Sequence, residues 1–243
     1  MKIVINLEYS FLRQFIEQLP VFFEEEGETI YSARNVIKVF KEKNLLLAVK
    51  RYRKPNFINR IIYANFRFSK AYRSYEYGLM LLKKGISVPV PVACIEEKRC
   101  GLLAYSYYVY LYDREATHIR ERMLGNPRDI VFEKNLAVFI AKLHSEGILP
   151  LDLSPGNILH KKREDGTDSF SLIDYNRMKF MDVIPKTIRY KNFMRISEND
   201  DIINYLAKEY ALHCHLNPEE AMREIYKYCY RFSDTMKSRA NKE

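Results

Sequence analysis

The sequence lacks closely spaced cysteine pairs, which limits the chemistry that its thiols can perform. Its four cysteines are Cys94, Cys100, Cys214 and Cys229, and none forms a C-x-x-C pair. Structural zinc sites normally draw their ligands from such pairs, so we expect no structural zinc here. Scattered cysteines are typical of free thiols in the reducing cytosol.

Long apolar runs are also missing. A membrane-spanning helix needs about 18 or more consecutive apolar residues, and no stretch of the sequence approaches that length. The apolar run at the N-terminus is interrupted by Glu8 and Arg13, which makes it too short and too charged for a signal peptide. We therefore expect a cytoplasmic protein whose only membrane contact is peripheral, at the inner face.

The composition is that of a folded, basic protein. Hydrophobic residues make up 47% and aromatic residues 14% of the 243 residues, which suffices for a packed core and argues against disorder. Lys and Arg number 40 against 31 Asp and Glu, a formal charge of +9. This field favours anionic partners. The aromatic run Tyr105–Tyr110 is expected to line the core and the hinge, so nucleic acid is not an expected partner.

Two regions of different secondary structure are predicted, with a candidate hinge near Leu111–Arg114. The region 1–112 reads as strands around one helix, rich in β-branched, aliphatic and aromatic residues. The helix has Tyr72, Tyr75, Leu79 and Leu82 at helical spacing, and Gly85 suits its end. The predicted strands and helix are Thr29–Arg34, Val36–Lys41, Leu45–Tyr52, Ser69–Lys84 (the helix), Val92–Glu96 and Leu102–Tyr112.

The region 113–243 is predicted to be mostly helical. Asn126-Pro127 suggests an N-cap followed by proline at the first helical position, and Gly147 suits the end of that helix. A last helix is expected to start at Asn217-Pro218. Together the regions predict an α+β, two-lobed plan. The apolar face expected on the first of these helices consists of Phe132, Leu136, Phe139, Ile140 and Leu143.

The strongest functional motif is D-x-x-x-x-N from Asp152 to Asn157, followed by Asp174 after an apolar strand. Phosphoryl transfer requires an aligned nucleophile and neutralised phosphate charge more than covalent help from the protein. Asp152 can accept a hydroxyl proton, while Asn157 and Asp174 offer hard oxygen ligands for magnesium. The alternative is that these residues only shape turns.

A second candidate set stands in the N-terminal region. Ala48 and Lys50 alternate onto one face of a predicted strand, where a small residue leaves room for adenine and the ammonium group can reach phosphates. Glu76 is expected on the apolar face of the following helix, where a carboxylate requires a partner, and Lys50 is the expected one. The alternatives are that Lys50 faces solvent on an edge strand and that Glu76 lies on the helix surface.

A glycine-rich phosphate loop is absent. Only Gly27 lies in the region where a G-x-G-x-x-G motif would stand. The turn around Glu25–Thr29 is the expected cover for phosphates, with no side chain assigned to the task.

These residues resemble the protein-kinase superfamily and, more closely, the bacterial lipopolysaccharide core kinases, which phosphorylate Kdo or heptose in the inner core. The resemblance implies ATP and Mg²⁺ as cofactors, Lys50 on the α- and β-phosphates and paired with Glu76, Asp152 as catalytic base, and Asn157 and Asp174 on magnesium. It covers roughly residues 30–180 and rests on Arg34-Asn35, Ala48-Val49-Lys50, Arg73 with Glu76, Pro89-Val90-Pro91, Leu143-His144, residues 152–159 and residues 173–178.

The sequence also departs from protein kinases. Pro150-Leu151 stands where H-R precedes the catalytic aspartate, Ser154 replaces the lysine often found two residues after it, and no A-P-E follows Asp174. These departures favour a small or glycolipid acceptor. A protein Ser/Thr kinase, a small-molecule kinase like those acting on aminoglycosides and choline, and a non-catalytic adaptor remain as alternatives.

Basic residues form two clusters that we expect to meet an anionic glycolipid, a sugar acceptor or an anionic membrane face. The alternative is that they are solvated faces, and the oligomeric state is left open. The clusters consist of Arg51, Arg53, Lys54, Arg60, Arg67 and Lys70, and of Arg223, Lys227 and Arg231.

Overall fold

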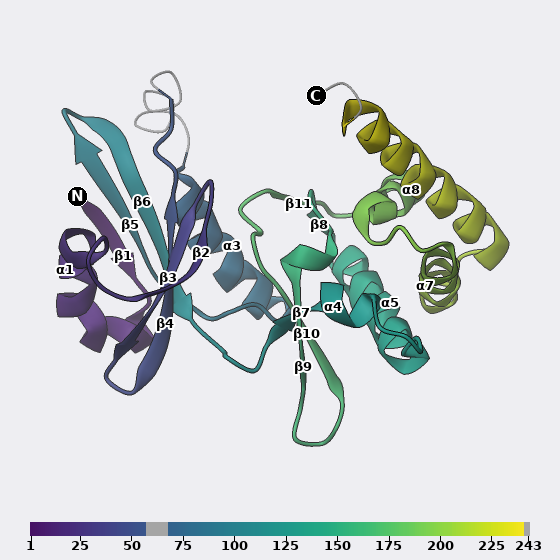
Figure 1. Cartoon of the computed structure of the whole chain (residues 1–243), viewed down its shortest axis with the longest axis horizontal. Helices are drawn as coiled ribbons and strands as arrows, with labels where there is room; N and C mark the ends of the chain where they lie inside the picture. The colour runs from purple at the N-terminus through teal and green to yellow at the C-terminus, as the bar shows by residue number, and fades with distance from the viewer. Residues whose placement is uncertain (57–67, 241–243) are drawn as a thin grey trace. The chain divides into compact units, whose positions relative to one another are not determined.

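A computed structural model describes residues 1–56 and 68–240 of the chain (Figure 1). The predicted basic residues Arg60 and Arg67 lie outside these residues. The chain divides into two compact units, Met1–Arg114 (unit 1) and Glu115–Glu243 (unit 2), and each is described by itself below. Within the described residues no helix is both long and apolar enough to cross a membrane.

Unit 1 is built on a six-stranded antiparallel sheet with the strand order β1-β5-β6-β4-β3-β2. The predicted strands are confirmed with small shifts at their ends, and β4 has the predicted bounds. The elements of unit 1 are β1 (Lys2–Ile5), a 3-10 helix (Leu7–Leu12), α1 (Arg13–Phe22), β2 (Glu28–Ser32), β3 (Val36–Glu42), β4 (Leu45–Tyr52), α3 (Lys70–Lys83), β5 (Pro91–Arg99) and β6 (Leu102–Leu111).

The two faces of this sheet are covered by different helices, α1 on one side and α3 on the other (Figure 1). Alternation along β4 sends Leu47 and Val49 into the core beneath α1, so Ala48 and Lys50 belong to the α3 face. Tyr52 on that face is bonded to Ser74 of α3, with 2.7 Å between the Tyr52 hydroxyl and Ser74 Oγ. The alternation therefore fixes which face carries the predicted lysine.

The N-terminal helix α1 was not predicted, although it completes the core. Leu12, Ile16, Leu19 and Phe23 are all at most 1% exposed and pack beneath the sheet. Burying an aliphatic or aromatic side chain contributes about 1.5–3 kcal/mol, so this segment adds substantially to the stability of unit 1. Charged residues interrupt it in the sequence because its opposite face is exposed to solvent.

The helix α3 is confirmed, but its buried face is not the predicted one. Ser69 caps it by accepting the Tyr72 N–H at 3.1 Å, and Gly85 follows its end with φ +68°, as a C-terminal glycine does. Of the residues predicted to face the core, only Tyr75 is buried, because the helix is rotated about its axis toward small side chains. The buried residues are Ala71, Ser74, Tyr75, Gly78 and Leu81.

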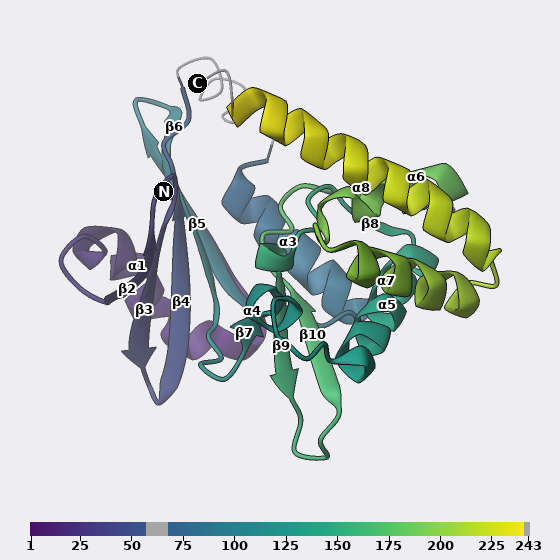
Figure 2. The same ribbon diagram turned by 45° about the vertical axis from the view of Figure 1, so that its right-hand side comes forward.

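Unit 2 combines short strands with a group of helices in which α7 lies between α5 and α8 (Figure 2). The last helix begins as predicted, because Asn217 Oδ1 accepts the Glu220 N–H at 2.9 Å. The elements of unit 2 are β7 (Thr117–His118), α4 (Ile119–Met123), α5 (Ile130–Ser145), β8 (Ile148–Pro150), a 3-10 helix (Pro155–Asn157), β9 (Ile158–Lys162), β10 (Asp168–Leu172), β11 (Met178–Phe180), α6 (Lys186–Asn192), a 3-10 helix (Phe193–Arg195), α7 (Asp200–His213) and α8 (Pro218–Ala240).

The predicted start of α5 was wrong. Asn126-Pro127 lies before the helix in a cis peptide, and the N-cap is Asp129, whose Oδ1 accepts the Phe132 N–H at 2.9 Å. A carboxylate caps at least as well as an amide, and an ion pair with Arg122 holds Asp129 in place. The predicted apolar face of α5 is otherwise buried, except that Phe139 is half-buried and stacks on Phe170.

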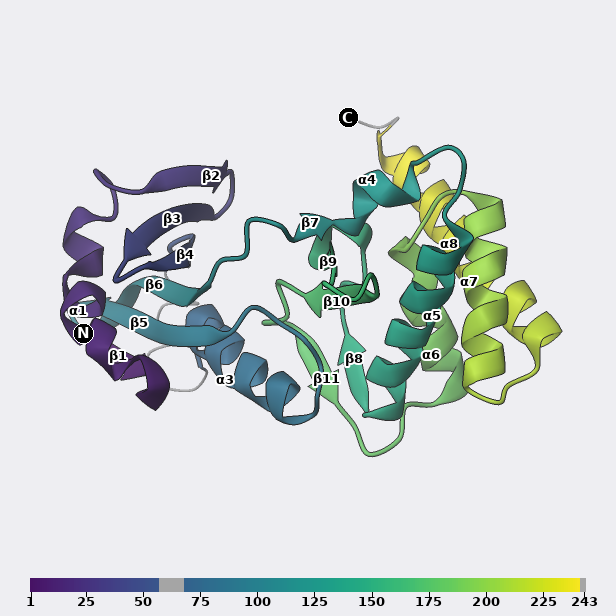
Figure 3. The ribbon, with the colours of Figure 1, turned by 90° about the horizontal axis from the view of Figure 1, so that it is seen from below.

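Gly147 ends α5 as predicted and joins it to the strand pair β8–β11 (Figure 3). Its φ is +71°, and a Cβ at this position would lie 1.8 Å from the Met181 carbonyl oxygen. Only glycine fits such a close approach without backbone movement. This turn sends the chain directly into the segment that carries Asp152.

Candidate active site

In unit 2 the three predicted residues Asp152, Asn157 and Asp174 meet at the open end of the hairpin β9–β10. The first residue of β9 pairs with the last residue of β10, so the segments before and after the hairpin lie side by side. Ile173 N–H donates to the Asn157 carbonyl at 2.9 Å, and Asn157 Nδ2 donates to the Asp152 carbonyl at 3.1 Å. The structure therefore brings the three residues together through one main-chain bond and one bond from the Asn157 amide to the Asp152 main chain.

Within the described part of unit 2, the Asp152 carboxylate forms an ion pair with Arg195. Arg195 Nη1 lies 2.7 Å from Asp152 Oδ1, and this oxygen is buried. The contact is an ion pair at an angle unsuited to a hydrogen bond. The Asp152 side chain is 22% exposed and that of Arg195 41%. With Oδ1 turned toward Arg195, Oδ2 is the oxygen that can meet a hydroxyl group.

Arg195 was missed by the sequence analysis. It ends the 3-10 helix Phe193–Arg195, where Phe193 is fully buried, and its guanidinium lies 5.5 Å from the centre of the Phe232 ring of α8. No short motif marks an arginine so far along the chain from the residue it contacts. The sequence offered one indirect sign of such a cation. Ser154 replaces the lysine that protein kinases often place two residues after the catalytic aspartate, so a cation from elsewhere in the chain could take that place.

A buried polar network holds the segment before Asp152. Asn192 Nδ2 donates to the Pro150 carbonyl at 2.7 Å, and Asn192 Oδ1 lies 3.0 Å from Nε2 of His144. The other ring nitrogen of His144 lies 2.8 Å from the Tyr210 hydroxyl. Burial lowers the pKa of His144 to about 4, although the Asn192 bond opposes this shift. His144 is therefore neutral near pH 7. It belongs to the motif Leu143-His144, and its role in this structure is to support the segment before Asp152 through Asn192.

Asp174 is held by its own segment. Its φ is +56°, a left-handed conformation that aspartate tolerates better than most residues, and Asn176 Nδ2 donates to Asp174 Oδ1 at 2.7 Å. Asn176 is 5% exposed and Tyr175 is 5% exposed. Asn176, two residues after Asp174, thus fixes the orientation of the carboxylate.

These groups fit magnesium as an ion shared with a phosphate ligand. Mg²⁺ is usually bound by one or two protein carboxylates together with substrate phosphates and waters. Asn157 uses Nδ2 toward Asp152, so its Oδ1 is the amide atom available as a ligand, and Asp174 adds a carboxylate. Among the described residues no group of three or more His, Cys, Asp or Glu could hold a metal by itself.

A second buried carboxylate in unit 2, Asp168, has a structural role. Burial raises the pKa of Asp168, but bonds from Lys162, Asn135 and His160 outweigh it and lower the pKa to about 2. The bonds measure 2.9 Å to Lys162 Nζ, 2.8 Å to Asn135 Nδ2 and 2.7 Å to His160 Nε2. A fully bonded carboxylate of this kind ties the hairpin β9–β10 to α5.

In unit 1, Ala48 and Lys50 lie on the α3 face of β4 as predicted. Ala48 is fully buried and pairs with Tyr110 of β6, while Lys50 pairs with Tyr108. Lys50 Nζ lies 5.3 Å from the centre of the Tyr52 ring. The half-buried lysine therefore lies beside the ring of Tyr52.

Glu76 lies on a different side of α3 from the buried residues that pack on the sheet. It is half-buried, and it accepts a hydrogen bond from Tyr72, whose pKa is raised first by burial and then by Glu76. Its charge also acts on Cys94 of β5. Among the contacts described for the chain, Glu76 meets Tyr72 and not Lys50, so the pair with Lys50 stays a prediction.

Gly27 has a packing role. Its φ is +83°, and a Cβ here would lie 2.6 Å from an atom of the Phe40 ring. The hairpin turn that closes β2 and β3 lies further on, at residues 33–35, where Asn35 Oδ1 accepts the Arg53 N–H at 3.1 Å. Arg34 lies in this turn and is exposed, and the expectation that the segment Glu25–Thr29 covers phosphates stays a prediction.

The fold belongs to the protein-kinase-like class: unit 1 is the small antiparallel-sheet lobe with its helix α3, and unit 2 is a reduced helical lobe. A solved structure described as WaaP in complex with acyl carrier protein is similar over 98% of this chain and 99% of that chain, with a TM-score of 0.65 and 13% sequence identity. This likeness shows the fold. No family model matches the sequence, and no curated protein matches it.

Proposed function

We propose that the protein is an ATP-dependent kinase that transfers the γ-phosphate to a sugar hydroxyl of the lipopolysaccharide inner core, on Kdo or heptose. The observation that carries this proposal is the junction of Asp152, Asn157 and Asp174 at the mouth of one hairpin in a protein-kinase-like fold. Each residue type matches a task that phosphoryl transfer requires.

Asp152 acts on the acceptor. Its Oδ2 accepts a hydrogen bond from the acceptor hydroxyl and takes the proton as the hydroxyl oxygen attacks the γ-phosphorus; ADP leaves on the opposite side. Arg195, 2.7 Å from Oδ1, holds the carboxylate in this orientation. The network of His144 and Asn192 fixes the preceding backbone, so the carboxylate needs little reorganisation before reaction.

The nucleotide is assigned to two further groups. Asn157 and Asp174 of unit 2 would hold Mg²⁺, which would supply positive charge to neutralise the phosphates of the nucleotide. Lys50 of unit 1 supplies an ammonium group for the α- and β-phosphates. Ala48, which has the smallest side chain that a strand can carry apart from glycine, leaves space for adenine on the same face of β4.

The acceptor class rests on three supports. The sequence resembles the lipopolysaccharide core kinases, the fold is similar to WaaP along almost the full length of both chains, and Pro150-Leu151 lacks the arginine that pairs with an activation-loop phosphate. The second candidate is a protein Ser/Thr kinase, which would need a region that docks a peptide substrate.

An acceptor panel tests the proposal. The full-length protein is incubated with γ-labelled ATP and Mg²⁺ together with Kdo–lipid A, heptosylated Kdo–lipid A, a generic protein substrate or amino-sugars. We expect label on a glycolipid sugar and a decrease of about 10²–10⁴-fold in kcat for Asp152→Asn. Binding of ATP to this variant should be unchanged, because Asp152 meets the acceptor.

Two outcomes would reject the proposal in part or in full. Label on the protein substrate alone would overturn the assignment of a glycolipid acceptor, while the assignment of ATP-dependent phosphoryl transfer would stand. Equal rates for the wild type and Asp152→Asn would overturn the catalytic role of Asp152. Ser154→Ala serves as a matched control, since Ser154 stands on the same loop without a contact to the Asp152 carboxylate among the described residues.

A further inference from the structure

The short helix α4 lies against the candidate active-site loop, residues 152–157. The strand β7 before it pairs antiparallel with β9, with His118 opposite Leu159, so the chain leaves β7 toward the residues that precede β9. There α4 packs on the 3-10 helix of the loop, and its fully buried Ile119 anchors it. The backbone therefore brings side chains of α4 to the candidate active site within one unit.

Arg120 of α4 reaches this loop at Gly156. A Cβ at Gly156 would lie 3.4 Å from Arg120 Nη2, so the guanidinium meets the loop where the chain carries no side chain. Gly156 precedes Asn157, the proposed magnesium ligand, and Asn157 Nδ2 donates to the Asp152 carbonyl. The cation therefore stands beside the segment that joins the proposed base to the proposed metal ligand.

The arginines of α4 differ in what they contact. Arg122 pairs with Asp129, and its guanidinium lies 4.8 Å from the centre of the Phe132 ring, so it holds α4 to α5. Arg120 is exposed, and no hydrogen bond or ion pair within the described residues involves its side chain. Its N–H donors are thus left for water or a ligand.

Phosphoryl transfer requires positive charge beside the reacting groups. As the phosphoryl group passes to the acceptor, negative charge spreads over its oxygens, and an arginine aimed at these oxygens lowers the barrier. Protein kinases often place a lysine two residues after the base, where this chain has Ser154. Arg195 is engaged at 2.7 Å by Asp152 Oδ1, whereas Arg120 touches the same loop without such a pair.

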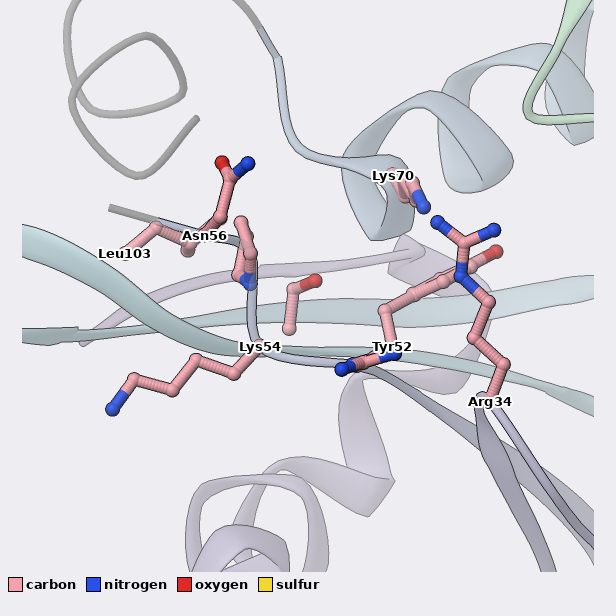
Figure 4. Close-up of a pocket in the computed structure, with 9 residues that line it drawn as sticks. Arg34, Tyr52, Lys54, Asn56, Lys70 and Leu103 are labelled. Carbon is pink, nitrogen blue, oxygen red and sulfur yellow. The ribbon is translucent and has the colours of Figure 1, made fainter. Parts of the chain in front are cut away.

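The cations of unit 1 have other positions. Lys50 is assigned to the α- and β-phosphates, and Arg34 and Lys54 line a cavity of about 570 Å³ at the end of β4 together with Tyr52 (Figure 4). All of these belong to unit 1, whereas Arg120 shares unit 2 with the proposed base and both proposed magnesium ligands. The fold of a single unit therefore sets its place beside them.

We infer that Arg120 is a catalytic residue whose guanidinium binds the oxygens of the phosphoryl group during transfer. The inference rests on the proposed function and deepens it. The bond from the γ-phosphorus to the ADP oxygen breaks, the bond to the acceptor oxygen forms, and Asp152 takes the acceptor proton; Arg120 donates hydrogen bonds and gives up no proton. Its contact is strongest in the transition state, so it raises kcat rather than ATP affinity.

Binding of a mimic tests this contact without turnover. ADP with Mg²⁺ and aluminium fluoride mimics the phosphoryl group in transfer, and ADP with Mg²⁺ alone lacks that group; each is titrated into the full-length protein by calorimetry. We expect Arg120→Gln to weaken binding of the mimic by about 10- to 100-fold, the size of one charged hydrogen bond, and to leave the Kd of ADP unchanged. Arg120→Lys should recover part of the loss, because it keeps the charge without the planar fork.

Turnover gives a second measurement. The kcat of Arg120→Gln should fall by a similar factor while its KM for ATP stays unchanged, because the contact belongs to the transition state. A raised KM for the acceptor, with binding of the mimic intact, would assign Arg120 to the acceptor and overturn the inference.

Arg163→Gln controls for net charge. Arg163 is exposed at the closed end of the hairpin β9–β10, where its Nη1 donates to Thr167 Oγ1 at 3.2 Å, and the candidate active site lies at the open end. This variant should bind ADP and the mimic like the wild type, and both glutamine variants should melt near the wild-type temperature because both arginines are exposed. Equal weakening in the two variants would overturn the inference.

Two other results would also overturn it. Unchanged binding of the mimic in Arg120→Gln would show that the side chain is only solvated. Equal weakening of ADP and of the mimic would assign Arg120 to the nucleotide before transfer.

The inference and the proposed function can fail separately. Binding of the mimic that depends on Arg120, without transfer to any glycolipid sugar, would uphold the role of Arg120 and reject the proposed acceptor. Transfer to a glycolipid sugar, with binding of the mimic unchanged in Arg120→Gln, would uphold the proposed function and reject the role of Arg120.

Discussion

In unit 1 the candidate residues stand on a sheet whose faces are filled by aliphatic and aromatic side chains, whereas in unit 2 they are joined by hydrogen bonds to each other and to a buried polar network. Lys50 packs against the Tyr52 ring, and Arg34 is exposed in a turn. Asp152, Asn157 and Asp174 are connected through main-chain and amide groups. The carboxylates of unit 2 are thus oriented by directed hydrogen bonds, while the cations of unit 1 stand on long side chains that start from a packed sheet or its turn.

This difference follows from what each group must do. A catalytic carboxylate must be oriented before the acceptor arrives, and directed hydrogen bonds provide that orientation. A cation that neutralises phosphate acts through charge, so a long side chain on a stable sheet suffices. Substitutions of the unit 1 cations should accordingly change ligand affinity and leave the free energy of unfolding unchanged. Substitutions in the polar network of His144 and Asn192 in unit 2 should lower the free energy of unfolding and leave ATP affinity unchanged.

Among the substitutions that test this comparison, the largest effect should come from Lys50→Met. Removing a charge-assisted contact with the phosphates costs about 1.5–3 kcal/mol, which corresponds to a rise of up to about 100-fold in the Kd of ATP. The melting temperature should stay near that of the wild type, since Met packs as well against Tyr52. Calorimetric titration with ATP and Mg²⁺ gives the Kd, and Lys41→Met, on the neighbouring strand β3, is the control. An unchanged Kd for Lys50→Met would contradict the assignment.

His144 tests the other half of the comparison through pH. Burial lowers its pKa from 6.5 to about 4, so the unfolded chain binds the proton more readily. The stability that His144 contributes is complete above about pH 6.5 and is lost as the pH falls from there toward 4. Between pH 7 and pH 5 the free energy of unfolding should decrease by about 2 kcal/mol, while Asp168, with its pKa of about 2, contributes little in this range.

Urea unfolding at the two pH values measures this decrease. His144→Gln carries no titrating group, so it should lose the decrease while being less stable at pH 7. Its Kd for ATP, measured under conditions where it is folded, should equal that of the wild type. If wild type and variant respond to pH alike, another group is responsible and the network around Asn192 lacks the proposed role.

A smaller effect is expected for Arg195, which acts through Asp152. Arg195→Gln removes the ion pair at Oδ1 and should lower kcat by about tenfold, as a loosened general base would, with the KM for ATP unchanged. Arg195→Lys should recover part of the loss because it restores the charge. Phe232→Leu, which removes the ring beneath the guanidinium, should lower kcat less. A change in the KM for ATP with kcat intact would indicate a role on the nucleotide instead.

The sequence could predict the parts of the site that follow from local spacing. The motif from Asp152 to Asn157, the strand before Asp174 and the alternation of Ala48 and Lys50 need only neighbouring residues, and the fold places each on the expected element. Arg195 could not be found in this way, because it reaches Asp152 through tertiary contacts from a segment without a motif. The segment α1 was missed for a related reason: its charged, exposed half obscures the apolar half that completes the core of unit 1.

Two errors have a common physical origin. Asn126-Pro127 and Asp129 are both acceptable helix starts by local preference, and the ion pair with Arg122 decides for Asp129. Tyr72 and Tyr75 both suit the apolar face of α3, and small side chains at Ala71, Ser74 and Gly78 turn the helix so that Tyr75 is buried. In each case packing against a distant element selects among local alternatives of similar energy.

A substitution of Glu76 should have the smallest effect on ATP affinity. It also tests most directly whether α3 is rotated about its axis as the structure shows. In the structure it is half-buried and accepts a hydrogen bond from the neutral hydroxyl of Tyr72. Glu76→Gln should therefore change the Kd of ATP by less than about threefold. In a double-mutant cycle, the change in ATP-binding free energy for Glu76→Gln/Lys50→Met should equal the sum of the two single changes, because the two side chains then act independently. A loss as large as that of Lys50→Met, with strong coupling between the two, would instead show that α3 turns to form the predicted pair when ATP binds.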